Sequence, residues 1–297
     1  MANLRDIRNR ITSVNNTIQI TKAMKMVAAA KLRKAQNRMN ETRPYRAKLS
    51  EVVSRLVSGN EQSNELLRTP ETVDRILLII VGSDRGLCGG FNNNLFKVVE
   101  SELRGRWSEK LASNSVDLIC VGKKANAYFR KRNYSVVEGH PGFFDQLNFP
   151  DTSVIMEGAR DQFVSGIYDQ VHIAYNEFKS VISQNRLVRK VLPVDPVELV
   201  KEHSGDDSVS VNDYLYEPDS AAILDRLLPL HLNMELWGAV LESNAAEQGA
   251  RMAAMDNATE NAKELEEDLR LSYNQARQSA ITTEISEIVS GAQALED

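Results

Sequence analysis

The sequence predicts an α/β protein in which long N- and C-terminal helices form an antiparallel coiled coil, with a central Rossmann-like open-sheet domain between them. Three observations predict this fold: an apolar stripe near the start, a second stripe near the end, and aliphatic runs alternating with helical stretches between them. The expected domains are an N-terminal coiled-coil helix at 1–57, a central α/β domain at 75–195 and a C-terminal coiled-coil helix at 219–297.

The first helix carries apolar or small residues at alternating steps of four and three. The stripe continues for nearly five heptads without Gly or Pro, which is typical of a helix that packs along another helix. Pro44 predicts a kink, and Ser58, Gly59 and Asn60 are expected to end the helix, which would be roughly 85 Å long. The stripe consists of Ile7, Ile11, Val14, Ile18, Thr21, Lys25, Ala28, Leu32, Ala35 and Met39.

The second helix is expected to begin after Pro218 and Asp219, and Pro229 suggests a local kink near its start. It repeats the same spacing, shifts by one residue after position 280, and continues to the end of the chain. Two helices that merely pack in a bundle remain the alternative. The first part of the stripe is Leu241, Ala245, Gln248, Met252, Met255, Thr259, Ala262, Glu266, Leu269, Tyr273, Ala276 and Ala280; the second is Ile281, Ile285, Ile288, Ala292 and Leu295.

The middle of the chain alternates between strand and helix signals. Continuous aliphatic runs such as 75–81 predict strands buried on both faces of a small parallel or mixed sheet. Polar residues at 58–74 are expected to form a linker, and the acidic stretch 196–217 a surface connection. The predicted strands are 75–81, 116–121, 135–138, 171–178 and 187–194, with helices that end near residues 104 and 132 and a third over 151–169.

The chain order has a geometric consequence. Two long helices joined through one compact domain run antiparallel. If their ends at the domain align, the first helix is long enough to pair with the second only as far as about residue 275. The last 20 or so residues, about 30 Å of helix, then have no partner within the chain. Because Ile281, Ile285 and Ile288 would otherwise face water, the sequence predicts that another protein surrounds this segment.

The net charge of the chain is −5, but positive and negative residues are distributed unevenly along it. Residues 1–40 contain nine Lys or Arg and one Asp, whereas residues 242–297 contain twelve Asp or Glu and four Lys or Arg. Opposite signs suit two helices that lie side by side, although a basic helix could instead bind nucleic acid or an acidic protein surface. The basic helix lacks the interleaved aromatic residues that stack on bases, which argues against nucleic acid.

Several classes of site are not expected. Cys88 and Cys120 form neither a disulfide framework nor a metal cluster, and the four histidines are scattered, so we expect buried reduced thiols and no metal or cofactor. The longest aliphatic run, 76–81, is far shorter than the roughly 20 residues of a membrane span. No secretory signal pattern is present, while prior removal of a mitochondrial presequence stays open. No catalytic triad or carboxylate pair can be argued from spacing, and the charge run 264–268 is expected on a solvated helix face.

The glycine-rich loop after the first strand allows three interpretations. Gly82, Gly86, Gly89 and Gly90 lack the GxGxxG spacing, and no Gly-Lys-Ser/Thr follows, so a nucleotide site is the weakest of them. A tight structural turn and a docking loop are the other two. In the first helix, Lys25 lies on the apolar stripe, where it either extends its ammonium outward or faces a partner.

Four segments resemble the gamma subunit family of F-type ATP synthases: Ile20–Gln36, Ser83–Asn92, Gly249–Ala262 and Ile281–Ala294. The resemblance implies a non-catalytic rotor shaft inside a hexamer of alpha and beta subunits, with the α/β domain on the epsilon subunit and the c-ring. Proton-driven rotation of the ring would cycle the catalytic beta subunits through ATP synthesis or hydrolysis. It also implies a peripheral location on the cytoplasmic face of a bacterial plasma membrane, or alternatively the matrix side of the mitochondrial inner membrane.

The resemblance implies two contacts of the first helix and the glycine-rich loop. Lys22, Met24 and Lys25 match a collar that faces an acidic loop of the beta subunit, where a basic surface would attract carboxylates. Cys88, with Arg85 in the same loop, resembles a lower contact with that region. The sequence has no inserted cysteine pair after the central domain, so the thiol switch of chloroplast relatives is not expected.

The resemblance also implies contacts along the second helix. Arg251, Gln278 and Thr282 match positions that contact beta-subunit loops, and each is polar among small residues. Ile285 and Ile288 match the apolar bearing at the end of the shaft. Two alternatives from other functional classes remain: a coiled-coil nucleic-acid-binding module on an α/β head, and a small Rossmann-like enzyme with coiled-coil extensions.

Overall fold

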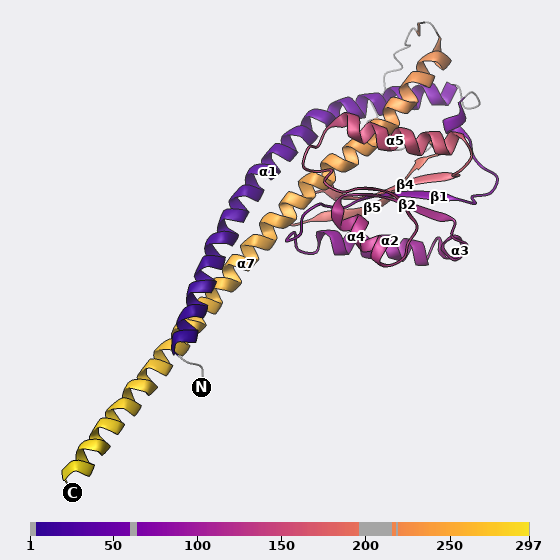
Figure 1. The fold of residues 1–297 in the computed structure, drawn as a ribbon. Helices are drawn as coiled ribbons and strands as arrows, with labels where there is room; N and C mark the ends of the chain where they lie inside the picture. Colours follow the sequence, from indigo (N-terminus) through magenta and orange to yellow (C-terminus); the bar gives the residue numbers. More distant parts are fainter. Residues whose placement is uncertain (1–3, 60–63, 196–215, 218, 297) are drawn as a thin grey trace. The chain divides into compact units, whose positions relative to one another are not determined.

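A computed structural model describes residues 4–59, 64–195, 216–217 and 219–296 (Figure 1). Contacts divide the chain into two compact units, one made of residues 1–29 and 251–297 and the other of residues 30–250. Two long helices, α1 (Leu4–Gly59) and α7 (Ser220–Glu296), contribute to both units. Most of the predicted surface connection, 196–217, lies outside the described residues, as do Asn60 and the side chains of Ala292 and Leu295.

The predicted open sheet is confirmed as a five-stranded mixed sheet with the order β3-β2-β1-β4-β5. The first four strands are parallel, and the last pairs antiparallel with β4 through a short turn. That hairpin extends the last strand, which begins at residue 184 rather than at the predicted 187, because Gln184 pairs with Phe178. The strands are β1 (Ile76–Val81), β2 (Val116–Val121), β3 (Val136–His140), β4 (Gln170–Phe178) and β5 (Gln184–Leu192).

Helices precede and connect the strands, and two short ones were not predicted: η1 (Glu65–Leu67), before β1, and α3 (Ser108–Ala112). The predicted helix over 151–169 is shorter and starts earlier, as α5 (Phe149–Val164). Its start is set by Asn148, whose side chain accepts a hydrogen bond from the Asp151 backbone. Its end is followed by Gly166 in a left-handed conformation, with φ of 73°. The remaining helices are α2 (Phe91–Arg104) and α4 (Lys123–Lys131).

The sheet is covered on both faces, as the continuous aliphatic runs predicted. Leu77, Ile79 and Val81 of β1 face a core that includes α1, α5 and α7, while Ile76 and Leu78 face α2 and α4. Every residue of β1 and β2 is buried. Removing this apolar area from water is the main source of stability for the unit of residues 30–250.

The stripe of the first helix is confirmed position by position, because all ten of its residues are buried or half-buried. In the unit of residues 1–29 and 251–297, side chains join α1 to α7 in antiparallel order. Arg8 Nη2 donates to Tyr273 Oη at 2.9 Å, and Asn15 Nδ2 donates to Glu266 Oε1 at 3.1 Å. Thr259 and Thr21 hydroxyls bond at 2.7 Å. α1 continues through Pro44 and α7 through Pro229, so neither proline ends its helix.

Candidate partner-contact site

The predicted collar lies on α1, and its three residues are not equally accessible. Lys22 is exposed, whereas Met24 and Lys25 are half-buried. Lys25 Nζ donates to Asp256 Oδ1 of α7 at 2.5 Å, so this stripe lysine is held by an acidic residue of the neighbouring helix. The complementary charges of the two helices therefore form at least one direct ion pair, and contact of the collar with another subunit stays a prediction.

Three exposed apolar side chains beside the collar were not predicted as contact residues. Ile20 is 59% exposed, Met26 61% and Val27 56%. They lie between the positions of the buried stripe, and in a long amphipathic helix such off-stripe apolar residues are the signal of a second contact surface. Together with Lys22 they make this part of α1 both basic and apolar.

The end of α7 is exposed along its length. Every side chain from residue 277 to residue 291 is exposed, including Gln278 and Thr282. The Thr282 hydroxyl donates to the Gln278 carbonyl at 3.0 Å, so it is satisfied within the helix. Exposure reaches 56% at Ile285 and 65% at Ile288, which agrees with the expectation that this segment has no partner within the chain. We call residues 277–291 the tip.

A groove lies where the paired part of these helices ends. It is open to solvent and is lined by Leu4 and Ile7 of α1 together with small residues of α7, among them Ala276 and Ala280. Arg251, farther from the tip, is buried with 9% exposure. The predicted contact of Arg251 with another subunit stays a prediction.

Hydrogen bonds to the Asp84 carboxylate hold the glycine-rich loop after β1, residues 82–90, in place. Asp84 accepts hydrogen bonds from the backbone N–H groups of Lys123, Gly142 and Phe144 at 2.7–2.8 Å. Asn92 accepts from the Ser83 backbone and donates to the Ser83 hydroxyl. These bonds fit the interpretation as a tight structural turn.

Cys88 of this loop is buried, with 3% exposure, and packs with Phe91 of α2 and Ala246 of α7. A contact of the loop with another subunit would therefore involve neighbouring residues rather than the thiol. Arg85 is mostly exposed and binds Asp145 at 3.1 Å. Its role as a contact residue stays a prediction.

The nucleotide interpretation of the loop meets a steric obstacle. In doubly wound folds, ligands bind outside the carboxyl ends of the strands where the strand order reverses, which here is between β1 and β4. The Ser243 hydroxyl of α7 donates to the Val81 carbonyl at the end of β1, at 3.3 Å. Ala246 and Ala250 pack against the loop and against Phe178 at the end of β4. The helix of the chain itself therefore fills the position of such a ligand.

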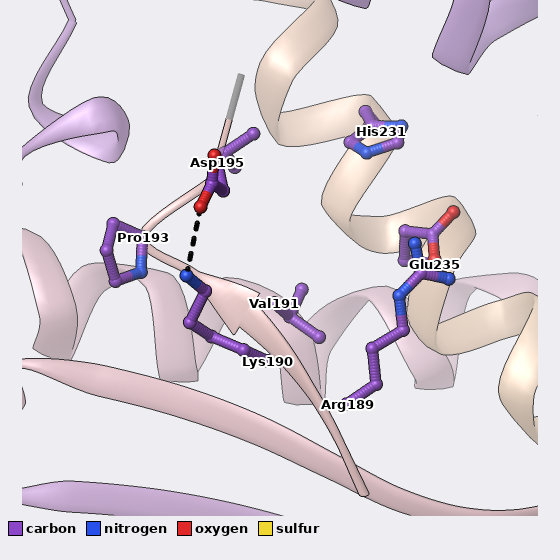
Figure 2. A pocket seen from close by; sticks show the side chains of 8 residues that line it. Arg189, Lys190, Val191, Pro193, Asp195, His231 and Glu235 are labelled. Carbon is purple, nitrogen blue, oxygen red and sulfur yellow. Dashed lines mark hydrogen bonds and ion pairs between the residues drawn. The ribbon is translucent and has the colours of Figure 1, made fainter. Parts of the chain in front are cut away.

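Charged side chains connect α1, α7 and β5 around Glu235 of α7. Glu235 lies 3.8 Å from Arg46 of α1 and 3.1 Å from Arg189 of β5, the latter pair visible in Figure 2. The Arg46 side chain crosses α7 at Gly238, where a Cβ atom would overlap its guanidinium. A larger residue at this position would therefore displace the Arg46 side chain from its path over the helix.

Glu242 is the most deeply buried acid of this charged group, with 5% exposure. Its Oε1 lies 3.9 Å from Arg43 and 4.0 Å from Arg46, and its Oε2 has no hydrogen-bond partner. Burial raises the pKa of this carboxyl group, while the two arginines act in the opposite direction. Burial likewise raises the pKa of the Cys120 thiol to about 12, which keeps that thiol protonated.

Neither a metal cluster nor a spanning helix is found in the part of the chain that the structure describes. No group of three potential metal-ligating side chains occurs among residues 4–59, 64–195, 216–217 and 219–296. Over the same residues, no helix combines the length and the hydropathy needed to cross a bilayer.

Comparisons with known proteins agree on one family. The family described as ATP synthase matches residues 3–295. The ATP synthase gamma chain of Prosthecochloris aestuarii is 50% identical over 297 residues, covering 100% of this chain and 99% of the relative. That of Salinibacter ruber is 46% identical over 307 residues, covering 100% and 99%.

Solved structures have the same fold. A chain of the Euglena gracilis mitochondrial ATP synthase OSCP/F1/c-ring structure matches with a TM-score of 0.71 and 22% identity, covering 98% of this chain and 94% of that one. A chain of the Tetrahymena thermophila mitochondrial ATP synthase central stalk and c-ring structure matches with a TM-score of 0.60 and 26% identity. It covers 80% of this chain and 99% of that one.

Proposed function

We propose, since this chain belongs to the gamma-chain family of ATP synthases, that it is the non-catalytic central-stalk subunit of such a complex. As the rotor shaft, it couples rotation of the membrane c-ring to conformational cycling of the catalytic beta subunits. The observation that carries this proposal is the tip: an apolar helical segment, exposed over residues 277–291, that continues beyond its antiparallel partner.

The partners follow from the chemistry of each surface. Alpha and beta subunits surround the tip, where Ile285 and Ile288 form the apolar bearing and Gln278 and Thr282 the polar contacts. The collar of Lys22, Met24 and Lys25 faces an acidic beta-subunit loop, and Arg251, Arg85 and Cys88 belong to further contact regions. The α/β domain meets the epsilon subunit and the c-ring, which makes the chain a peripheral membrane-associated subunit on the cytoplasmic face of a bacterial plasma membrane.

The nucleic-acid-binding alternative has no comparable support. The relatives and structures compared above are named for ATP synthases. In the coiled coil, the basic helix already uses Lys25 to bind Asp256 and Asn15 to bind Glu266. Both contacts reduce the free donors that phosphate binding would need.

Assembly tests the proposal directly. Ile285→Glu combined with Ile288→Glu places two charges in the tip, so we expect at least about a tenfold weaker association with alpha and beta subunits, equivalent to about 1.4 kcal/mol. The measurement is co-purification of the full chain with both subunits, followed by ATP hydrolysis and proton pumping.

The matched control makes the same chemical change elsewhere. Val164 and Ile167 are 40% and 43% exposed near the end of α5, so Val164→Glu combined with Ile167→Glu adds two charges away from the tip. This control is expected to assemble normally. Normal assembly of the tip variant, or failure of the unmodified chain to bind alpha and beta subunits, contradicts the proposal.

A further inference from the structure

The part of α7 from Ser243 to Ala250 is seated between two loops of the α/β domain. One is the loop 82–90 after β1, and the other is the turn between β4 and β5. Both loops follow strands that flank the point where the strand order reverses, so they form the two walls of one crevice. We call this crevice, with the helix inside it, the socket.

Small residues allow the helix to enter the socket. A Cβ atom on Gly249 would lie 3.4 Å from both Cα and the carbonyl oxygen of Val181 in the β4–β5 turn, and 3.5 Å from the Phe178 ring. A methyl group would just touch this backbone, and a branched side chain would have to displace it. On the other wall, Ala246 is fully buried against Cys88 and Phe91.

The walls of the socket are themselves held in place. The Asp84 carboxylate anchors the loop 82–90 by accepting hydrogen bonds from the backbone at the start of α4 and in the loop after β3, and Asn92 holds the Ser83 backbone. On the other side, the Ser180 backbone donates to the Ser183 carbonyl at 2.9 Å, and the Ser180 hydroxyl accepts from the Ser183 backbone at 3.0 Å. Each wall is therefore held by more than one hydrogen bond.

We infer that the socket is the joint through which torque passes between the α/β domain and the helical shaft, and that Gly249 is the residue that positions α7 in it. This inference rests on the proposed function, because torque has meaning only in a rotary complex. The helix is gripped by packing on both sides and by the Ser243 bond to β1, so turning the domain must turn the helix. Core packing of Leu236 and Val240 also joins α7 to the domain, so a loosened socket would make the joint more compliant under load while both parts remained folded.

Graded substitution of Gly249 in the reconstituted holoenzyme tests the inference. Gly249→Val is expected to keep ATP hydrolysis but to lower the number of protons pumped per ATP by about twofold or more, because the branched side chain forces the wall outward. Gly249→Ala, which just fits, is expected to show a smaller loss. Gly158→Val is the matched control, since Gly158 of α5 has no neighbouring atom within 4 Å of its Cβ position.

The outcomes separate the inference from the function on which it rests. If the unmodified chain does not assemble or support pumping, the proposed function fails. If the unmodified chain pumps and both Gly249 variants pump with an unchanged ratio, the inference fails and the function stands. Should Gly249→Val not assemble, the Gly249→Ala variant decides: a lowered proton-to-ATP ratio with normal hydrolysis supports the joint, and an unchanged ratio overturns it.

Discussion

Two stretches of the same helix, the seated part of α7 near residues 236–250 and the tip at 277–291, are opposite in their surroundings. In the seated part, Leu236 and Val240 are fully buried and even Ser243 has no exposed surface, whereas in the tip Ile285 and Ile288 are exposed. Secondary structure does not distinguish them, because both are continuous α-helix. The difference teaches that one continuous helix can be stabilised by its own domain in one stretch and lack any packing from the described chain in another.

The largest expected effect is on the free energy of unfolding, when one side chain in each stretch is truncated to alanine. Leu236→Ala leaves a cavity in the core and is expected to lower the free energy of unfolding by about 2–5 kcal/mol. Ile285→Ala removes an exposed side chain and is expected to change it by less than about 0.5 kcal/mol. Urea unfolding of the isolated chain, followed by circular dichroism, measures both. Equal losses would show that the tip is packed within the chain.

A smaller effect concerns the buried carboxyl group of Glu242. Because burial raises its pKa, the folded state holds this proton more tightly than the unfolded state does. Its contribution to stability is therefore fully present below the unfolded-state pKa and is lost as pH rises through the raised folded-state value. Glu242→Gln should remove this part of the pH dependence. The unfolding free energy of the variant should therefore rise relative to that of the unmodified chain as pH increases.

The control for this measurement is Glu284→Gln, which removes a carboxylate from the exposed tip of the same helix. Unfolding free energies of the three proteins are compared from about pH 4, near the ordinary pKa of a glutamate side chain, to about pH 8. A curve for Glu242→Gln that runs parallel to that of the unmodified chain would mean that the two arginines, not burial, determine the titration of Glu242.

The smallest effect is expected for the Lys25–Asp256 ion pair, whose side chains are 41% and 49% exposed. Exposed ion pairs contribute little because water and salt screen them, so a double-mutant cycle with Lys25→Ala and Asp256→Ala should give a coupling of about 1 kcal/mol or less. The coupling should shrink further in high salt. A coupling several times larger would show that this region is better shielded from solvent than its exposure indicates.

Much of the fold could be predicted because its signals are local. The four–three spacing identified the stripe from Ile7 to Met39, and the aliphatic runs identified β1 and β2 almost to the residue. The last strand was misjudged because its beginning is set by pairing with β4, a contact that periodicity does not encode. The short helix α3 was missed because five residues carry too little pattern.

The candidate site was predicted less completely, for a similar reason. The exposed tip followed from counting residues along two antiparallel helices. The burial of Cys88, in contrast, depends on Ala246, which lies far away in the sequence. Lys25 could be placed on the stripe, but its partner Asp256 could not be chosen among the twelve acidic residues of the C-terminal segment without the register of the two helices.

The passage of Arg46 over Gly238 limits how the two long helices can move against each other. The guanidinium occupies the space that any β-carbon at that position would need, and acidic side chains stand on both sides of it. Sliding one helix along the other by a turn would bring Met234 or Glu242 beneath the arginine in place of the glycine. Sliding of one helix along the other would therefore require the Arg46 side chain to move and its contacts with Glu235 and Glu242 to be remade.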